Sequence, residues 1–430
     1  MSGRRNGRAP PTARRSTGLR VPRSEAAAWV LLVLLPMLLL PRPGAAQVTL
    51  WDGAGASLEL GGYGRTLSGL SHTGFQLPGQ ERTTAFSAQV LRLQWDLRIG
   101  ESVVVRVHDL VQLQLSSAAA GQTLAGFGVS AIPGRTLDLR REFIERERIR
   151  GWHDVDRLAV TLYSDVGDVT VGRQAITWGI SSLFPVADLW SRFSPFELDT
   201  EEKPGVDAVR WLSYPGSGWE VDVVVADRGS RDDLSFGVRG SRVLPWADLW
   251  VAGGKLWRQA MVMAGISAPV DSWKLRAEAV LPRDLDREAW ERPRVTLGVD
   301  WLAGNLLATG EYHLNGIGSA DPGGYLSVLA DPRYQRGETY YLGRHYLGGL
   351  LSWAPGNDRL TLGLSGIVNL SDPSSAWTPV ATYDLGQSAR LSLGGVVTTG
   401  APPRLEPDPT PASEYGSFGD VVFTRVSVYF

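Results

Sequence analysis

The sequence contains no cysteine among its 430 residues. This absence excludes a disulfide scaffold, a zinc ribbon, an iron–sulfur cluster and a thiol nucleophile. The five histidines are scattered, and none has the spacing of a metal-binding pair on one element. The chain also has no GxSxG element, phosphate-binding loop or dinucleotide fingerprint. The sequence therefore predicts no cofactor, no bound metal and no enzymatic activity.

The chain has almost no net charge, with a formal value of -2. That value averages two unlike parts, because the first 46 residues hold eight arginines and one acid, Glu25. With eight of the 43 basic and one of the 45 acidic residues set aside, positions 47–430 carry a charge of about -9. A basic surface is the usual footprint of nucleic-acid binding. We therefore expect no nucleic-acid partner.

The sequence also has little that could form a membrane-spanning helix. The apolar run from Ala26 to Leu40 has 15 residues, whereas a spanning helix needs roughly 20. The run follows the basic leader and ends in the small residues Gly44, Ala45 and Ala46, as in a secretory signal peptide. We expect residues 1–46 to direct the chain to an export translocon and to be cleaved off. After cleavage, residues 47–56 would form a short periplasmic N-terminal segment. A membrane anchor is the alternative for the apolar run.

A two-residue period runs through the remaining chain instead. Apolar side chains alternate with polar ones along Leu91–Ile99, Trp219–Val225 and Val295–Trp301, as on a strand with one apolar and one polar face. Strands of soluble sandwiches run to about six residues, while strands of membrane barrels need roughly 9–11. Thr84–Ile99 and Asp358–Leu370 exceed the shorter length. The pattern favours a barrel whose apolar face meets lipid and whose polar face lines the lumen.

Connection lengths support the same fold, because short turns alternate with long loops along the chain. We predict an all-β, transmembrane, antiparallel up-and-down β-barrel over residues 57–430, with about 18 strands and 16 as the alternative. Its turns would be periplasmic, and its long loops would be extracellular. The longest loops are expected near 116–156, 179–205, 316–343 and 399–417.

The end of the chain and the tryptophans agree with a barrel. Asp420–Phe430 alternates up to a terminal phenylalanine, and a last strand ending at Phe430 resembles the assembly signal of outer-membrane barrels. We therefore expect the barrel-assembly machinery to be a partner. Ten of the 16 tryptophans fall mostly near predicted strand ends, where an indole suits the headgroup boundary. Trp152, Trp178 and Trp250 are among these ten.

One local motif has a clear resemblance. Gly172, Arg173, Gln174, Trp178 and Gly179 form a GRQ-x-x-x-WG element. The loop that follows has a stretch with Phe184, Pro185, Asp188 and Leu189. The element resembles porin-like outer-membrane barrel families, many of whose members have no assigned substrate. The match covers about residues 157–211, and it implies fold and compartment rather than cargo.

Arg173 has two interpretations. An arginine facing lipid at the bilayer midplane costs roughly 2–4 kcal/mol. Arg173 should therefore face the lumen or pair with an acid, for which Glu197, Asp199, Glu201 and Glu202 are candidates. It would then either pin the loop 179–205 inside the barrel or contact a solute.

Other charged residues on the predicted inner faces are candidates for the pore lining. These candidates are Arg92, Arg98, Arg106, Arg173, Glu220, Asp222, Lys274, Arg276, Glu278 and Asp300. The densest charge run, Arg140–Arg150, has the i,i+3 and i,i+4 pairs of a solvated loop helix. A helix folded into the pore is the alternative for that run.

These observations predict an outer-membrane channel for passive or selective diffusion of small hydrophilic solutes, in contact with outer-membrane lipid. A non-conducting barrel, with its lumen filled by loops and acting as a scaffold or assembly partner, is the second interpretation. A barrel hydrolase that uses His313 is the third, although its element lacks a serine nucleophile. The solute is not identified, and a homotrimer remains one alternative for the assembly.

Overall fold

The computed structural model describes residues 47–75, 81–118, 135–193, 201–356, 359–404 and 410–430. The predicted signal peptide, residues 1–46, lies outside the described residues. Two of the acids proposed for Arg173, Glu197 and Asp199, lie outside them as well.

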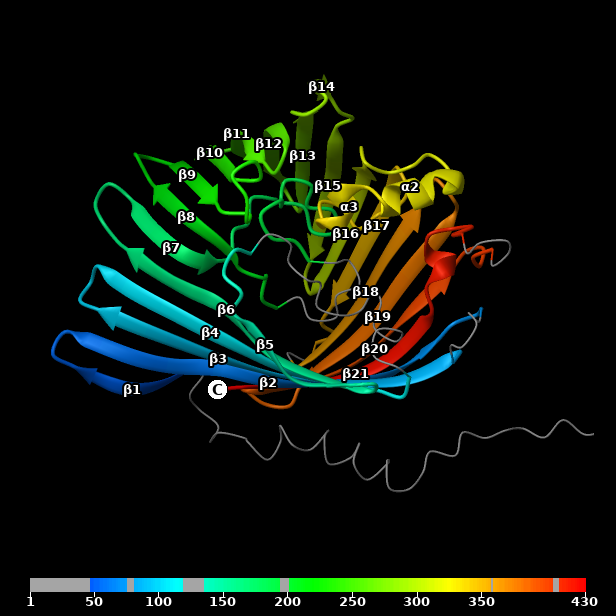
Figure 1. Ribbon diagram of the computed structural model, residues 1–430, viewed down its shortest axis with the longest axis horizontal. Helices are drawn as coiled ribbons and strands as arrows, with labels where there is room; N and C mark the ends of the chain where they lie inside the picture. The colour runs from blue at the N-terminus through cyan, green and yellow to red at the C-terminus, as the bar shows by residue number, and fades with distance from the viewer. Residues whose placement is uncertain (1–46, 76–80, 119–134, 194–200, 357–358, 405–409) are drawn as a thin grey trace, which may run out of the picture.

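The described chain forms one closed antiparallel β-barrel (Figure 1). Of its 21 strands, β1, β5 and β14 are additions, and the other 18 form the ring. β21 pairs with β2 from Tyr63 opposite Tyr429 to His72 opposite Asp420, which closes the sheet. In ring order these strands are β2 (Ala56–His72), β3 (Thr83–Ile99), β4 (Val103–Ser116), β6 (Ile149–Leu162), β7 (Asp168–Gln174), β8 (Val206–Ser213), β9 (Trp219–Ala226), β10 (Ser235–Val243), β11 (Asp248–Leu256), β12 (Gln259–Val270), β13 (Trp273–Asp284), β15 (Arg294–Ala303), β16 (Leu306–Leu314), β17 (His345–Trp353), β18 (Leu360–Asn369), β19 (Ser374–Asp384), β20 (Ala389–Thr399) and β21 (Asp420–Tyr429). The predicted fold and the count of 18 strands are confirmed.

The three additional strands extend the wall locally. β1 (Gln47–Gly53) makes a hairpin with the first part of β2, next to the end of β21. There Phe430 and Gly62 exchange two backbone hydrogen bonds of 2.8 and 3.0 Å. β5 (Arg140–Arg146) pairs with β6, and β14 (Ala289–Trp290) pairs with β13.

The two rims of the barrel differ, as the connection lengths predicted. One rim carries short turns, such as 100–102, 271–272 and 304–305. We call it the turn rim, and we call the opposite one the loop rim. At the loop rim, the connection 315–344 holds η1 (Pro322–Gly324), α2 (Tyr325–Leu329) and α3 (Pro332–Gln335), and the connection 400–419 holds η2 (Tyr415–Ser417). No helix among the described residues is both long and apolar enough to cross a membrane.

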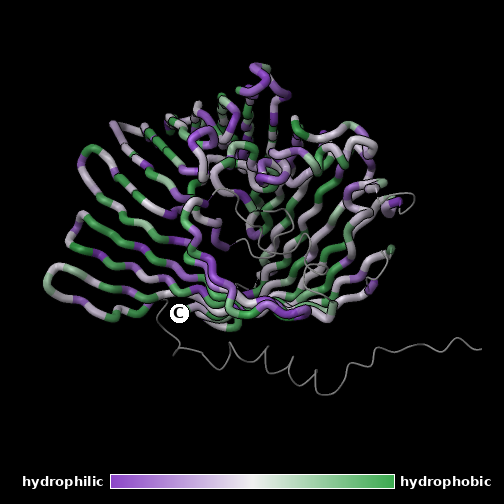
Figure 2. Tube along the Cα trace, viewed as in Figure 1, coloured by the Kyte–Doolittle hydropathy of each residue, from purple (hydrophilic) through white to green (hydrophobic). Residues whose placement is uncertain are grey.

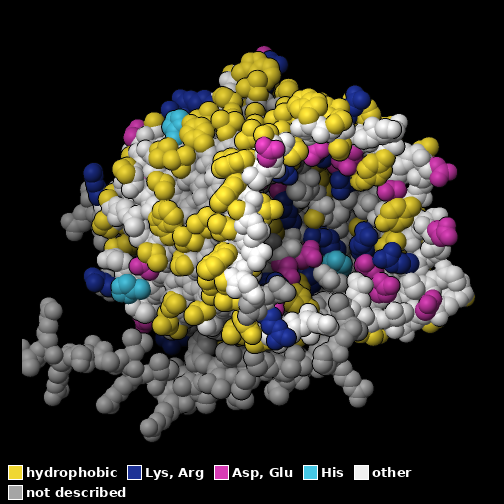
Figure 3. Space-filling view, turned by 180° about the vertical axis from the view of Figure 1, so that it is seen from behind, with side chains coloured by type: hydrophobic (Ala, Val, Ile, Leu, Met, Phe, Trp, Pro, Cys, Tyr) yellow, Lys and Arg dark blue, Asp and Glu magenta, His cyan; other side chains and the backbone are white. Residues whose placement is uncertain are grey.

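The two faces of the wall follow the alternation in the sequence. Hydropathy alternates residue by residue along the strands (Figure 2). Seen from behind, apolar side chains cover much of the outer wall and charged ones gather in a central hollow (Figure 3). Trp211, Trp219, Trp273 and Trp353 are exposed. In a membrane barrel, much of the apolar surface lies on the outer face, because that face contacts lipid.

The boundary expectation is wrong for three tryptophans. Trp152, Trp178 and Trp250 are 5%, 1% and 4% exposed, so their rings are covered by protein. Arg140 stacks on Trp152, and Trp178 packs edge-on against Trp190. A position near a strand end does not say which face of the wall the side chain takes.

The predicted helix over the charge run Arg140–Arg150 is also wrong. The run forms β5, a turn at 147–148 and the start of β6. Helical charge pairs contribute only about 0.2–0.5 kcal/mol each, whereas pairing with β6 satisfies a series of backbone donors and acceptors. The expectation of a solvated run holds, because most of the β5 side chains are exposed.

Candidate functional site

The lumen is crossed by the connection between β7 and β8, residues 175–205, of which 175–193 and 201–205 are described. β16 lies eight places from β7 in the ring of 18 strands, on nearly the opposite wall. The backbone N–H groups of Ser182, Leu183 and Phe184 nevertheless donate to the Glu311 carboxylate on β16, at 2.7, 3.0 and 3.0 Å. The connection therefore spans the lumen, and we call it the lumen loop.

A second carboxylate holds the lumen loop from β13. Glu278, 1% exposed, accepts hydrogen bonds from the backbone N–H of Ile180 at 2.7 Å and of Ala187 at 3.5 Å. Beside it, Arg276 donates to the Ile180 carbonyl at 2.7 Å. Arg276 also forms ion pairs with Asp300 at 2.7 Å and with Glu311 at 3.0 Å. The predicted lining residues Arg276, Glu278 and Asp300 thus come together, and two of them bind the loop directly.

A third contact holds the start of the lumen loop at β9. The Trp178 indole N–H donates to Asp222 at 2.8 Å, and Arg210 of β8 donates to the same carboxylate at 2.9 and 2.7 Å. Gly237 of β10 leaves room for the indole, since a Cβ there would lie 2.7 Å from Trp178. Asp222 was predicted as a pore residue, but its carboxylate is occupied by these two partners.

Gly172 and Arg173 of the predicted motif lie where β7 runs beside β6. Gly172 has φ +117°, and a Cβ there would lie 2.1 Å from the Leu158 carbonyl oxygen, so the close approach of β6 and β7 requires glycine. Arg173 is fully buried. Its guanidinium donates to Asp207 at 2.8 and 3.1 Å, to the Val155 carbonyl at 2.9 Å and to the Leu137 carbonyl.

Arg173 therefore secures the described segment 135–139 of the β4–β5 connection rather than the lumen loop. Asp154 lies 3.6 Å from its guanidinium as a second acid. The proposed partners Glu201 and Glu202 pair elsewhere, with Arg65 and with Arg157. Asp207 and Asp154 were missed because they lie on flanking strands, and a sequence does not give the register between strands.

The other motif residues lie around the base of the lumen loop, where Gln174 is buried and Gly179 is half-buried. Gln174 donates to the carbonyls of Thr170 at 3.1 Å and Ala208 at 3.3 Å. Gly179 sits under the loop, where a Cβ would lie 2.9 Å from Pro185 and 3.1 Å from Asp188. The element GRQ-x-x-x-WG thus covers two features, the close approach of β7 to β6 at Gly172 and the point where the lumen loop enters the lumen.

The remaining predicted lining residues differ in how far they are covered. Arg92 is buried and pairs with Asp156 at 2.8 Å. Arg98 and Arg106 have looser partners, Glu59 at 3.8 Å and Asp96 at 3.7 Å. Glu220 pairs with Arg239 at 3.1 Å, and Lys274 is exposed near the turn rim.

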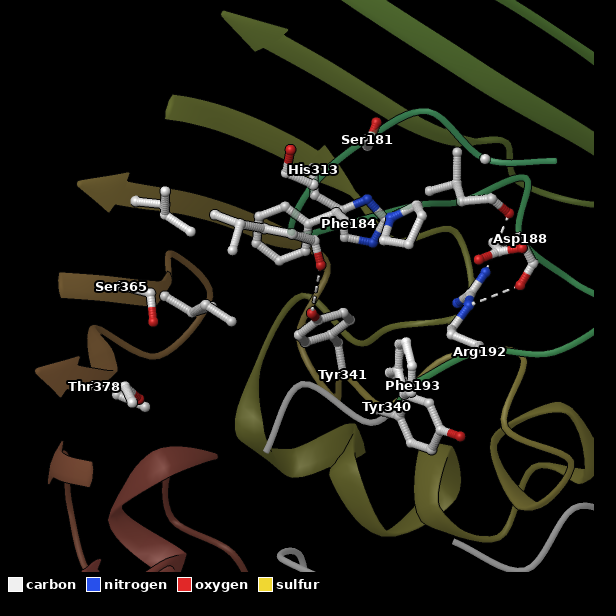
Figure 4. Close-up of a pocket in the computed structure, with 18 of the residues that line it drawn as sticks. Ser181, Phe184, Asp188, Arg192, Phe193, His313, Tyr340, Tyr341, Ser365 and Thr378 are labelled. Carbon is white, nitrogen blue, oxygen red and sulfur yellow. Dashed lines mark hydrogen bonds between the residues drawn. The ribbon is translucent and has the colours of Figure 1, made fainter. Parts of the chain in front are cut away.

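A cavity of about 500 Å³ remains between the lumen loop and the wall formed by β17 to β20 (Figure 4). The wall contributes side chains without charge, among them Leu350, Ser365, Thr378 and Val396. The opposite side carries hydroxyl, aromatic and charged groups of the loop and of the 315–344 connection. These are Ser181, Ser182, Phe184, Asp188, Arg192, Phe193, Lys203, Tyr340 and Tyr341.

Arg192 contributes a positive charge to this cavity and forms no ion pair with a carboxylate of the described residues. It donates to the carbonyls of Asp188 at 3.3 Å, Glu338 at 2.6 Å and Val186 at 3.2 Å. Lys203, in contrast, is paired with the Asp188 carboxylate. Burial raises the pKa of Asp188, and the Lys203 ammonium opposes that rise. Sequence reasoning missed Arg192, because loop residues have no period that assigns them a face.

His313 lies at the edge of the cavity, where its imidazole packs against neighbouring side chains. It stacks on Phe184 at 5.0 Å between centroids, and Nδ1 lies 3.3 Å from the Thr296 hydroxyl and 3.2 Å from the Val295 carbonyl oxygen. No group of three or more His, Asp or Glu side chains that could hold a metal occurs within the described part of the chain.

Three solved structures with a similar architecture are distant in sequence. OccAB2 of Acinetobacter baumannii has a TM-score of 0.55 at 10% identity, over 88% of this chain and 99% of that one. A BenF-like porin from Pseudomonas fluorescens has 0.54 at 14%, over 87% and 98%. The outer membrane protein opdK from Pseudomonas aeruginosa has 0.53 at 11%, also over 87% and 98%.

Comparison of the sequence with family models and with curated proteins gives no match. At these identities, the similarity to solved structures establishes the fold alone. The chain has the 18-stranded barrel architecture found in outer-membrane porins.

Proposed function

We propose that this protein is an outer-membrane channel through which small hydrophilic solutes diffuse passively. The observation that carries the proposal is the cavity of about 500 Å³ left between the lumen loop and the β17–β20 wall. A barrel of this strand number is wide enough to enclose an aqueous channel unless loops fill it. Here the described part of the lumen loop crosses the lumen and leaves this cavity against the wall, and the proposed passage runs through the cavity.

The two sides of this passage suggest how it would treat charged solutes. The wall side is neutral, and the loop side carries the charge of Arg192, for which the described residues provide no ion-pair partner. Most other charges on the inner face are already paired, so they contribute little net field at the cavity. We expect the passage to admit neutral solutes and to favour small anions over small cations.

Replacing Arg192 tests this expectation. A single charge at about 4 Å is worth about 1 kcal/mol in water-like surroundings, which corresponds to about a fivefold change in a permeability ratio. Arg192→Glu should therefore move the anion-to-cation permeability ratio toward cations by at least that factor, and Arg192→Gln by less. Reversal potentials of the purified full chain in planar bilayers under a salt gradient measure the ratio.

Arg258→Glu is the matched control, because Arg258 is a partly exposed arginine at the loop rim, paired with Asp286 and Asp232. It changes the charge of the protein by the same amount as Arg192→Glu, away from the cavity. An unchanged ratio in folded Arg192→Glu would remove Arg192 from the passage. No conductance from the folded wild type would instead favour the second function.

The second candidate is a non-conducting barrel that acts as a scaffold or assembly partner. The dense anchoring of the lumen loop by Asp222, Glu278 and Glu311 favours it, because such anchoring makes a stable obstruction. The two functions differ in whether freeing the loop increases an existing current or creates one. A hydrolase would need a nucleophile beside His313, and the packing of that ring against Phe184 and Thr296 does not support one.

A further inference from the structure

Two carboxylates join three separate connections at the loop rim. Glu414 belongs to the connection 400–419, and Asp372 belongs to the connection 370–373. The backbone N–H of Glu414 donates to the Asp372 carboxylate at 2.6 Å. Tyr325, in the connection 315–344, donates its hydroxyl to the same carboxylate at 2.6 Å.

The Glu414 carboxylate itself is almost completely enclosed, with 2% exposure. It accepts hydrogen bonds from the Leu342 backbone N–H at 2.9 Å, the Tyr346 hydroxyl at 2.6 Å and the Asn369 amide at 2.8 Å. We call Asp372, Glu414, Tyr325, Tyr346 and Asn369 the carboxylate latch. It fastens the connection 315–344 to the ends of β17 and β18.

The latch contains two acids and no base. No ion pair within the described residues includes Asp372 or Glu414. The guanidinium of the adjacent Arg344 is directed to the Gly318 carbonyl, at 3.4 Å. The titratable groups that act electrostatically on Glu414 or feel its charge are Asp372, Tyr325, Tyr334, Tyr341, Tyr346 and Tyr415. A buried carboxylate with an acidic neighbour and no cation is costly when ionised.

The latch is coupled to the cavity through one residue. Tyr341 precedes Leu342, lines the cavity and donates its hydroxyl to the Leu183 carbonyl of the lumen loop at 3.3 Å. Its ring lies 4.9 Å from that of Tyr346 and 5.2 Å from that of Phe184. A change in how Leu342 is held would therefore reach the cavity wall.

We propose that the carboxylate latch is a proton-dependent switch, which holds the connection 315–344 over the cavity while Glu414 is protonated and releases it when both acids are ionised. The control of passage by this switch rests on the proposed channel function. The switch itself does not depend on conduction.

The direction of the switch follows from the environment of Glu414. Burial raises the pKa of Glu414 to about 7, and the Asp372 carboxylate adds to the rise, while hydrogen bonds from Tyr346, Leu342 and Asn369 oppose it. An exposed glutamate has a pKa of about 4.3. The latched state therefore binds the proton on Glu414 more tightly than the released state does. The proton stabilises the latched state fully when the pH is below the ordinary glutamate pKa. This stabilisation is lost as the pH rises through about 7.

Hydrogen exchange of the full chain in detergent micelles tests the switch without requiring conduction. Amides of 338–345 in the wild type should exchange as slowly as in Glu414→Gln below pH 6. Above about pH 7 the wild type should exchange faster by up to about tenfold for each pH unit, as expected for one linked proton. Comparing the two proteins at each pH cancels the intrinsic pH dependence of exchange.

Glu288→Gln is the control, since Glu288 is an exposed acid of another loop-rim turn, and it should behave as the wild type does. If Glu414→Gln does not fold, Asp372→Asn serves instead and should weaken the pH dependence by removing the repulsion. Exchange in 338–345 that keeps a constant ratio between wild type and variant from pH 6 to 9 would overturn the switch. Bilayer currents recorded over the same range test its control of passage. A pH-independent current beside pH-dependent exchange would overturn that control and keep the switch.

Discussion

Removing the two carboxylates that hold the lumen loop is expected to open the barrel and raise its conductance several-fold. Glu311 and Glu278 together accept five backbone N–H groups of residues 180–187. Hydrogen bonds to a charged group contribute about 1.5–3 kcal/mol each. The double variant Glu278→Gln/Glu311→Gln keeps half of the acceptor oxygens and loses the charge. We expect it to lose on the order of 5 kcal/mol of loop anchoring.

The measurement is single-channel conductance of the purified variant in planar bilayers. Glu220→Gln is the control, because Glu220 pairs with Arg239 on the wall. The change removes one carboxylate of the wall, against two in the double variant, and does not touch the loop. The folded barrel should keep its heat-modifiable migration on gels in both variants. Wild-type conductance in the folded double variant would show that these carboxylates do not hold the obstruction. A current that appears only in the double variant would favour the non-conducting barrel over the open channel.

The sequence was sufficient for the fold because a barrel strand has a local signature. The alternation along Leu91–Ile99 or Val295–Trp301 assigns each side chain to one of two faces, and only long strands carry it for so many residues. The same parity placed Arg276, Glu278 and Asp300 on the inner face. The same parity applies to Glu311, because it shares a face of β16 with Thr309 and His313. Glu311 is nevertheless absent from the predicted lining residues.

What those inner charges do could not be predicted, because their partners are distant in sequence. Glu311 binds the backbone of residues 182–184, which precede it by more than a hundred positions, and no periodicity links them. A carboxylate whose partner is a backbone N–H leaves no complementary residue to search for. Three of the ten predicted lining residues, Asp222, Arg276 and Glu278, are therefore occupied in fixing the lumen loop.

The charge run Arg140–Arg150 shows the opposite error, a local signal that is real but too weak. Its helical pairs are present in the sequence, yet the strand β6 offers a backbone partner that the sequence alone does not display. The expected helical pairs are Glu142 with Arg146 and Glu147 with Arg150. In the structure Arg150 of β6 instead pairs with Glu142 of β5, at 3.0 Å. Local propensity gives way where tertiary pairing satisfies a whole row of backbone groups.

Replacing Arg173 is expected to cause the largest loss of stability in the barrel wall. Arg173→Ala leaves Asp207 buried without its guanidinium and frees the carbonyls of Val155 and Leu137. Breaking a buried ion pair by removing one partner costs about 3–5 kcal/mol. Arg173→Lys should recover only part of this, because one ammonium cannot reproduce the fork that reaches Asp207 and two carbonyls at once. The fraction of barrel that keeps its folded gel mobility in increasing urea measures the loss.

A double-mutant cycle then separates this pair from a general loss of charge. Asp207→Asn alone should also destabilise the barrel, because it leaves the Arg173 guanidinium buried without its carboxylate. The double variant Arg173→Ala/Asp207→Asn removes both partners. It should therefore lose clearly less stability than the sum of the two single changes. Arg106→Ala is the reference, since Arg106 is 38% exposed and lies 3.7 Å from Asp96, a pairing worth about 0–1 kcal/mol. Strict additivity in the cycle, or equal losses for Arg173→Ala and Arg106→Ala, would mean that the buried guanidinium does not secure the segment 135–139 to the wall. A coupling of several kcal/mol would identify the arginine of the GRQ element as a structural tie in the barrel wall.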